Sequence, residues 1–498
     1  MTLSMGTNGV RGLFDELGPS QAMDLGFGFA HFVKQHSKKA KAGKTKKSKV
    51  SFPLVALARD MRLTSPCIFE ATAAGLMEGG AQVADLGILT APASEWTAAR
   101  LGASGLVIVT ASHNPPEWNA LKFVDANGVA VSRERGASIA HFIGKPHHPV
   151  PAWPQMGKIE AVPDVIGEYQ RAVLRFVNRR RISGAHRPLR VVADPGNGTS
   201  TLVAPAIFKA LGVRSSFINE KLDGRFPNRP SEPAKANIET LIEKVTDSGA
   251  DMGVAWDGDA DRVTFVDEKG GWISGDMGVA LSAKWALYLL EQESKNKNKN
   301  KRRKRNSSSL PPLVVTTVAT SRVVEKAAAV HGAKTEYTDV GAPYLSERVH
   351  SLGERVVMAG EEVGGIVWPQ FSLAKDGVLA AGKLLEMAAY APLSEWVKTL
   401  PKFYNSKLKI ACPPGVNLRL AAMLQKELQS DLPTHAILRP LKGGFRIDFE
   451  SAWVLVRASG TENYVRVFSE AREQEEADSL SRQYQLMVSN RLREIDMV

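Results

Sequence analysis

The stretch GLVIVTASHNPPEWNALKF, residues 105–123, runs from a short apolar segment directly into a polar cluster. Residues 106–109 are apolar and rich in β-branched side chains, which predicts a buried β-strand. Ser112 would then lie just beyond the carboxyl end of that strand, where ligands bind in open α/β sheets. A serine beside His113, with Lys122 downstream, suits an activated nucleophile, although an ordinary polar turn explains the stretch equally well. The rest of the chain has to decide between the two interpretations.

The length and composition predict a multidomain protein. The chain has 498 residues, of which 44% are hydrophobic, and at about 150 residues per domain this length predicts three or four domains. Cys67 and Cys412 are too few for a disulfide framework, and the first residues show no charged-then-apolar leader. No uninterrupted apolar run approaches the roughly 18 residues of a membrane span. We therefore expect a cytoplasmic protein with no membrane partner.

The formal net charge of +12 comes from two short tracts. Residues 38–49 carry seven lysines and residues 295–305 carry eight basic residues, so the rest of the chain has a formal charge of −3. Low-complexity basic segments of this kind are typical of solvated insertions. Binding of the tracts to an acidic partner such as nucleic acid is the alternative, because basic surface is the footprint of phosphate-backbone recognition.

Strand-like and helix-like segments alternate along the chain, which predicts an α/β fold. We expect four domains around a central cleft, with boundaries at residues 1–155, 156–271, 272–398 and 399–498. The first three are predicted to be mixed α/β domains with helix-flanked sheets, and the last an α+β domain. One polar motif follows an apolar strand-like run in each: VIVTASHNP, VAWDGDADR, VVMAGEEVGG and VLVRASGTEN. If these four strand ends converge, they line one polar cleft.

The motif DGDADR, residues 257–262, offers Asp257, Asp259 and Asp261 at alternate positions. An extended loop would present all three carboxylates to one side, as hard oxygen ligands for Mg²⁺. A calcium loop is a weaker alternative, because Arg262 occupies its glycine position and residues 254–256 suggest a strand where that motif needs a helix. An unliganded acidic turn would leave three carboxylates repelling one another.

Two further motifs are weaker on their own. Arg457, Ser459 and Thr461 surround Gly460 in RASGTEN, an arrangement that suits a phosphate cradle of guanidinium, hydroxyls and backbone N–H groups. Glu361 in GEEVGG would accept hydrogen bonds from sugar hydroxyls. A surface turn is the alternative for both motifs.

Taken together, the motifs resemble those of the α-D-phosphohexomutases. GTNGVRG (6–12), TASHNPPEWNALK (110–122), DGDADR (257–262), GEEVGG (360–365) and RASGTENYVR (457–466) occur in the order found in that family. The resemblance extends over nearly the whole chain and implies four domains around a deep cleft. It also implies a phosphohexomutase, an intramolecular phosphotransferase that interconverts hexose 1-phosphate and hexose 6-phosphate through a bound 1,6-bisphosphosugar.

The resemblance also implies a role for each motif. Ser112 would be the phosphoserine and would complete the Mg²⁺ site formed by the three aspartates, with a hexose 1,6-bisphosphate as activator. Lys122 and Arg11 would serve proton transfer and charge stabilisation beside His113, and a lysine in that role needs a lowered pKa. The implied substrate-binding residues are Arg262, Glu361, Arg457, Ser459, Gly460 and Thr461.

Three positions depart from the family pattern. Val363 stands where Ser or Asn is usual, Lys375 replaces Arg, and Asn463 replaces Pro. Val363 would remove a side-chain contact to the sugar. The motifs favour a phosphoglucosamine mutase, with a phosphomannomutase/phosphoglucomutase as the alternative, acting on a small phosphosugar as a monomer or dimer. Two alternatives are a nucleic-acid-binding protein that uses the basic tracts on a degenerate mutase body, and a phosphatase-like hydrolase.

Overall fold

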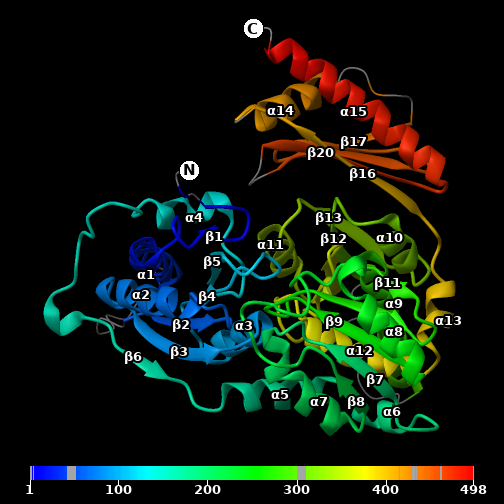
Figure 1. The fold of residues 1–498 in the computed structure, drawn as a ribbon, viewed down its shortest axis with the longest axis horizontal. Helices are drawn as coiled ribbons and strands as arrows, with labels where there is room; N and C mark the ends of the chain where they lie inside the picture. The colour runs from blue at the N-terminus through cyan, green and yellow to red at the C-terminus, as the bar shows by residue number, and fades with distance from the viewer. Residues whose placement is uncertain are drawn as a thin grey trace.

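The computed structural model describes residues 3, 5–41, 52–299, 310–413, 415–428, 432, 435–459 and 463–496. These residues form four sheets along the chain (Figure 1), so the prediction of four helix-flanked units is confirmed. The domain boundaries remain a prediction. Short 3₁₀ turns occur at Trp153–Gln155, Thr199–Leu202, Lys235–Asn237 and Gly353–Arg355.

The first sheet has six strands in the order β1-β5-β4-β2-β3-β6. Strands β4, β2, β3 and β6 are parallel neighbours, whereas β5 runs antiparallel to both β4 and β1. The central strands β2 and β4 are nearly continuous apolar runs whose successive side chains enter two different cores, so both faces of the sheet are covered. The strands are β1 (Val10–Leu13), β2 (Leu54–Arg59), β3 (Gln82–Ile88), β4 (Gly105–Val109), β5 (Trp118–Asp125) and β6 (Ile159–Ala161); the helices are α1 (Pro19–Lys41), α2 (Ser65–Glu78), α3 (Ala91–Arg100) and α4 (Arg133–Ala140).

The second sheet, in the order β11-β10-β9-β7-β8, continues the core of the first across helices α3 and α5. Its central strand β9 is buried throughout and ends directly before the acidic motif. The strands are β7 (Arg190–Asp194), β8 (Arg214–Phe217), β9 (Met252–Trp256), β10 (Val263–Asp267) and β11 (Trp272–Ile273); the helices are α5 (Val165–Phe176), α6 (Arg179–Ser183), α7 (Ala204–Leu211) and α8 (Glu239–Ser248).

The third sheet has the order β13-β12-β14-β15 and places the GEEVGG motif in the turn between β14 and β15. Helix α12 is buried along nearly its whole length and packs against both this sheet and the second. The strands are β12 (Leu313–Thr317), β13 (Lys334–Thr338), β14 (Val356–Glu361) and β15 (Gly365–Val367); the helices are α9 (Gly275–Lys299), α10 (Arg322–Ala329), α11 (Ala342–Leu352), α12 (Gly377–Ala388) and α13 (Leu393–Lys398).

The fourth sheet is fully antiparallel, β16-β20-β19-β18-β17, and is covered by two helices, which confirms the predicted C-terminal α+β unit. It lies at one end of the molecule in Figure 1. The strands are β16 (Tyr404–Ala411), β17 (Ile437–Leu441), β18 (Gly444–Asp448), β19 (Trp453–Ala458) and β20 (Tyr464–Ala471); the helices are α14 (Val416–Leu428) and α15 (Gln474–Asp496).

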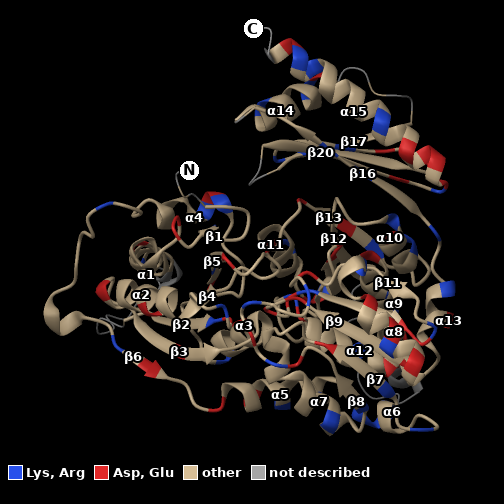
Figure 2. Cartoon of the chain, in the orientation of Figure 1, with Lys and Arg blue, Asp and Glu red and all other residues tan. Residues whose placement is uncertain are grey.

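The two basic tracts begin in the last residues of α1 (38–41) and α9 (295–299), and their remaining residues fall between α1 and β2 and between α9 and β12. Residues 42–51 and 300–309 lie outside the described residues, so the predicted solvated insertions stay a prediction. Elsewhere Figure 2 shows Lys and Arg interspersed with Asp and Glu. Within the described ranges, no helix combines the length and the apolar character needed to span a membrane.

Candidate active site

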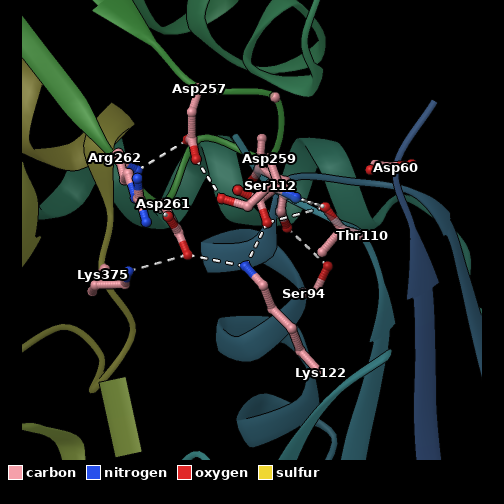
Figure 3. Close-up of polar contacts among 12 residues, drawn as sticks. Asp60, Ser94, Thr110, Ser112, Lys122, Asp257, Asp259, Asp261, Arg262 and Lys375 are labelled. Carbon is pink, nitrogen blue, oxygen red and sulfur yellow. Dashed lines mark hydrogen bonds and ion pairs between the residues drawn. The ribbon is translucent and has the colours of Figure 1, made fainter. Parts of the chain in front are cut away.

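Ser112 lies three residues beyond the end of β4, in a strained backbone conformation. Its φ of +52° falls in the left-handed region, which a non-glycine residue adopts only when its surroundings enforce it. The side chain is 4% exposed, and its Oγ donates a hydrogen bond to Asp257 Oδ2 at 2.5 Å. The apolar strand therefore delivers a buried hydroxyl to the acidic loop of the neighbouring unit (Figure 3).

The acidic loop brings its three carboxylates together by a tight turn. The Ala260 amide donates to the Asp257 carbonyl at 3.1 Å, and Ala260 has a φ of +61°. One carboxylate oxygen from each of Asp257, Asp259 and Asp261 lies within 4.8 Å of the others, and all three residues are buried. The expectation of an extended loop is therefore wrong. The three carboxylates come together because the backbone turns, and not because alternate side chains of an extended segment point the same way.

This triad fits a divalent cation. Asp259 Oδ1 and Asp261 Oδ1 are buried and have no hydrogen-bond partner, so each leaves an oxygen free for a ligand bond. Burial, followed by the charges of Asp259 and Asp261, raises the pKa of Asp257 well above its ordinary value. A bound cation would relieve this repulsion, and carboxylate oxygens are the donors that Mg²⁺ prefers.

Lys122 projects from β5 between two carboxylates of the triad. Its Nζ lies 2.7 Å from Asp259 Oδ2 and 3.0 Å from Asp261 Oδ2. Burial alone would lower the pKa of Lys122, but the two aspartates outweigh it and raise the pKa above the ordinary lysine value. These contacts alone do not provide the lowered pKa that a proton-transfer role needs; they hold the Lys122 amine between two carboxylates.

Arg11 and His113 lie beside Ser112. Arg11, on β1, donates from Nη1 to Asn114 Oδ1 at 2.7 Å, and burial together with nearby Arg262 lowers its pKa. Burial, then Arg262 and Arg11, lowers the pKa of His113 to about 2, so the imidazole is neutral. His113 Nδ1 is buried without a hydrogen-bond partner.

The GEEVGG turn is connected to the acidic loop through Lys375. Lys375 Nζ donates to Glu361 Oε1 at 2.7 Å and lies 3.3 Å from Asp261 Oδ2. The sequence marks Lys375 only as a departure from a family pattern, and its contact with the triad was not predicted. Val363, at the tip of the turn, is 36% exposed.

The fourth motif supplies two guanidinium groups. Arg457 on β19 and Arg466 on β20 are directly opposite in the antiparallel pairing, and burial followed by Arg466 lowers the pKa of Arg457. Like charges placed opposite one another in a sheet are destabilising unless an anion lies between them. Arg466 was not predicted, although RASGTENYVR ends on it. Gly460 and Thr461 lie outside the described residues.

These residues meet in a cleft of about 250 Å³ to which all four units contribute. Arg262 and Arg466 each keep a buried Nε without a hydrogen-bond partner there, as expected of a site for anions. Asp257 and Asp259 lie behind the cleft wall, in contact with Ser112 and Lys122. The predicted site residues that line the cleft are Arg11, Ser112, His113, Lys122, Asp261, Arg262, Glu361, Arg457 and Ser459.

The sequence matches four family models in chain order. They are the phosphoglucomutase/phosphomannomutase alpha/beta/alpha domain I (residues 2–148), domain II (167–271) and domain III (279–404), and the C-terminal domain of the same proteins (416–484). The chain therefore belongs to the phosphoglucomutase/phosphomannomutase family of α-D-phosphohexomutases, which are isomerases of the phosphotransferase type.

Curated relatives carry different substrate names. The chain is 34% identical over 95% of both chains to a phosphoglucomutase/phosphomannomutase of Thermococcus kodakarensis. It is 32% identical, over 85% of this chain and 87% of the relative, to a probable phosphoglucosamine mutase of Methanothermobacter thermautotrophicus. A phosphopentomutase of Thermococcus kodakarensis is 30% identical over 95% of both chains. These relatives share the mutase family and differ in the sugar phosphate that their names specify.

Solved structures share the fold. A phosphoglucomutase/phosphomannomutase family protein from Burkholderia thailandensis superposes with a TM-score of 0.78 at 23% identity, over 98% of this chain and 97% of the other.

Proposed function

We propose that this phosphohexomutase carries its phosphoryl group on Ser112 and interconverts a hexose 1-phosphate with the 6-phosphate. The observation that carries the proposal is the Ser112 Oγ contact with Asp257 at 2.5 Å, at the wall of a cleft that Arg457 and Ser459 line from a different unit. A hydroxyl within reach of three carboxylates suits a phosphoryl carrier. The cationic residues of the fourth unit suit the phosphate that is not being transferred.

The reaction has two balanced halves. The O–P bond to phosphoserine 112 breaks as a sugar hydroxyl oxygen forms its own bond to phosphorus; the proton of that hydroxyl ends on the Ser112 oxygen, which gives a bound 1,6-bisphosphate and a free serine hydroxyl. After the sugar reorients, the Ser112 oxygen bonds to the phosphorus of the other phosphate and gives up its proton to the sugar oxygen whose O–P bond breaks, and the product monophosphate leaves. A hexose 1,6-bisphosphate taken up from solution restores the phosphoserine whenever the intermediate is lost.

Different residues bind the sugar phosphate and stabilise the charge of the transferred phosphoryl group. Arg11, Lys122 and Arg262 line the same cleft as Ser112, and these three cations would stabilise the charge on the transferring group. Neutral His113 offers its unpartnered Nδ1 for a hydrogen bond to the substrate. Glu361, held by Lys375, accepts hydrogen bonds from sugar hydroxyls. Mg²⁺ bound at Asp257, Asp259 and Asp261 would supply further charge neutralisation.

We infer glucosamine phosphate as the sugar, with mannose and glucose phosphates as the alternative. The GTNGVRG opening and the alanine in DGDADR support an amino sugar, as does the resemblance to the probable phosphoglucosamine mutase. A reducing compartment such as the cytoplasm suits Cys67 and Cys412, which are not joined in a disulfide. The intact catalytic set argues against a degenerate mutase body that binds nucleic acid.

A coupled assay tests the proposal. Purified enzyme is given Mg²⁺, a trace of bisphosphosugar, and in turn the 1-phosphates of glucosamine, N-acetylglucosamine, glucose, mannose and ribose. The account predicts 6-phosphate formation from at least one hexose, its loss on chelation, and its return with added Mg²⁺. Activity on ribose 1-phosphate alone would contradict the hexose assignment, and release of inorganic phosphate at the rate of sugar turnover would identify a hydrolase.

A further inference from the structure

The backbone carbonyl of Ser112 is held by two side chains from two different units. Arg62, in the loop before α2, donates from Nη2 to the Ser112 carbonyl at 2.9 Å. Ser231, in the loop between β8 and α8, donates from Oγ to the same carbonyl at 3.0 Å. Both side chains are buried. The left-handed backbone of Ser112 is therefore fixed from each side.

The Ser231 hydroxyl also reaches the acidic loop. The amide of Gly258, which lies between Asp257 and Asp259, donates to Ser231 Oγ at 2.9 Å. One hydroxyl thus accepts from the metal-loop backbone and donates to the backbone of the nucleophile loop, which uses its single proton and one lone pair. A side chain at position 258 would come within 2.9 Å of both the Ser112 carbonyl and Ser231 Oγ, so the two loops are as close as glycine permits.

The loop that carries Ser231 is itself firmly anchored to the second unit. Arg229 donates to Asp194 Oδ2 at 2.7 Å and to the Trp256 carbonyl at 2.7 Å, and its Nη1 donates to the Ser231 carbonyl at 3.2 Å. Asp194 and Trp256 are the last residues of β7 and β9. The position of Ser231 is therefore set by the same strand ends that set the acidic triad.

We propose that Ser231 is a positioning residue for phosphoryl transfer. Its hydroxyl fixes the Ser112 backbone relative to the Asp257–Asp261 loop. The Ser112 oxygen is thereby held against the carboxylates, where its phosphoryl group can pass in line to the incoming sugar oxygen. Without this hydroxyl, the Ser112 carbonyl is held only by Arg62 of its own unit. The side-chain contact between Ser112 and Asp257 remains, but the strained peptide after Ser112 gains freedom to rotate. The inference rests on the proposed role of Ser112.

A misplacement of reacting groups by about 1 Å can cost about a hundredfold in rate. The loss of one of the two side-chain hydrogen bonds to the Ser112 carbonyl should therefore lower kcat by about tenfold or more. The substrate-binding residues are unchanged, so KM should stay within about twofold. Truncation to alanine removes a single oxygen and leaves the loop's other anchors in place, so the Ser231→Ala protein should fold normally.

The experiment compares the full-length parent with Ser231→Ala and with Ser469→Ala as the matched control. Ser469 is also buried and donates one hydrogen bond to a backbone carbonyl, that of Ala477, but it lies in the fourth unit. For each protein we would measure kcat, KM, thermal stability and amide hydrogen exchange over residues 110–118. The inference predicts a lower kcat and faster exchange in Ser231→Ala only.

Three results would overturn the inference: a Ser231→Ala kcat within about twofold of the parent, equal losses in both variants, or a lower kcat without faster exchange in residues 110–118. If the parent itself has no mutase activity and no phosphate on Ser112, the proposed function fails. The exchange measurement still decides then whether Ser231 restrains the loop.

Discussion

Asp376 offers a test of how the second and third units are joined. It caps α12 by accepting from the Leu379 amide at 2.8 Å, and Tyr169 on α5 donates its hydroxyl to both carboxylate oxygens at 2.8 Å. Both residues are buried, with 1% and 0% of their surface exposed. Burial raises the pKa of Asp376 from 3.8 to about 6, although the Leu379 amide and Tyr169 oppose the shift.

The direction and size of the pH effect on stability follow from this pKa shift. Asp376 binds its proton more tightly in the folded protein than in the unfolded chain. The free energy of unfolding therefore falls as the pH rises from below 3.8 to above 6 and the carboxylate becomes charged. A change from 3.8 to about 6 corresponds to about 3 kcal/mol. Asn cannot ionise, yet it keeps an oxygen for the Leu379 amide. Asp376→Asn should therefore raise the free energy of unfolding by up to about 3 kcal/mol at pH 8, and by only about 1 kcal/mol at pH 4.5.

Chemical denaturation of parent and variant at both pH values measures the difference. Asp164→Asn serves as the control, because Asp164 pairs with Arg171 on the surface with more than half of each side chain exposed. That substitution should change stability by less than about 1 kcal/mol at either pH. The reasoning is refuted if Asp376→Asn gains no more stability at pH 8 than at pH 4.5, or is destabilised at both.

Three further predictions concern activity. Replacing residues 38–49 and 295–305 with short Gly/Ser linkers should leave kcat/KM nearly unchanged while making the protein acidic; a large loss of turnover at unchanged thermal stability would show that the tracts serve catalysis. The parent should accept more than one hexose phosphate, and Val363→Ser should sharpen the preference for one sugar over its epimer by about tenfold to a hundredfold. Unchanged kcat/KM ratios in a strictly selective parent would mean that Val363 does not face the sugar. Lys375→Arg should stay active because a guanidinium can still contact Glu361 and Asp261. Lys375→Met should lose about a hundredfold in kcat/KM because buried Glu361 loses the cation that pairs with it. Equal activity in both variants would contradict the role of Lys375 as the partner of Glu361.

The four strand-end motifs could be found from sequence because each follows an apolar run. Ser112 and Glu361 are local consequences of where a strand stops, and parallel neighbours bring such ends to one edge of a sheet. The order of the motifs then identified the family. This is the part of the fold and site that periodicity and spacing encode.

What the sequence did not reveal depends on contacts between distant positions. The raised pKa of Lys122 comes from Asp259 and Asp261, more than 130 residues away along the chain. The role that the resemblance implies for Lys122 needs a lowered pKa, whereas the fold places two carboxylates against its Nζ. Ser231 likewise carries no motif, and it became a candidate only when the structure placed its hydroxyl between two loops. The tight turn at residues 257–262 was missed because alternating aspartates suit an extended loop equally well.

The central claim is that Ser112 carries the phosphoryl group that is transferred. The most direct test is a single-turnover experiment in which peptide mapping follows the phosphate on the enzyme after mixing with a hexose 1-phosphate. The account predicts one phosphate on Ser112, its passage to the sugar at least as fast as kcat, and neither phosphate nor turnover in a normally folded Ser112→Ala protein. A phosphate found only on another residue, together with full turnover by Ser112→Ala, would contradict it.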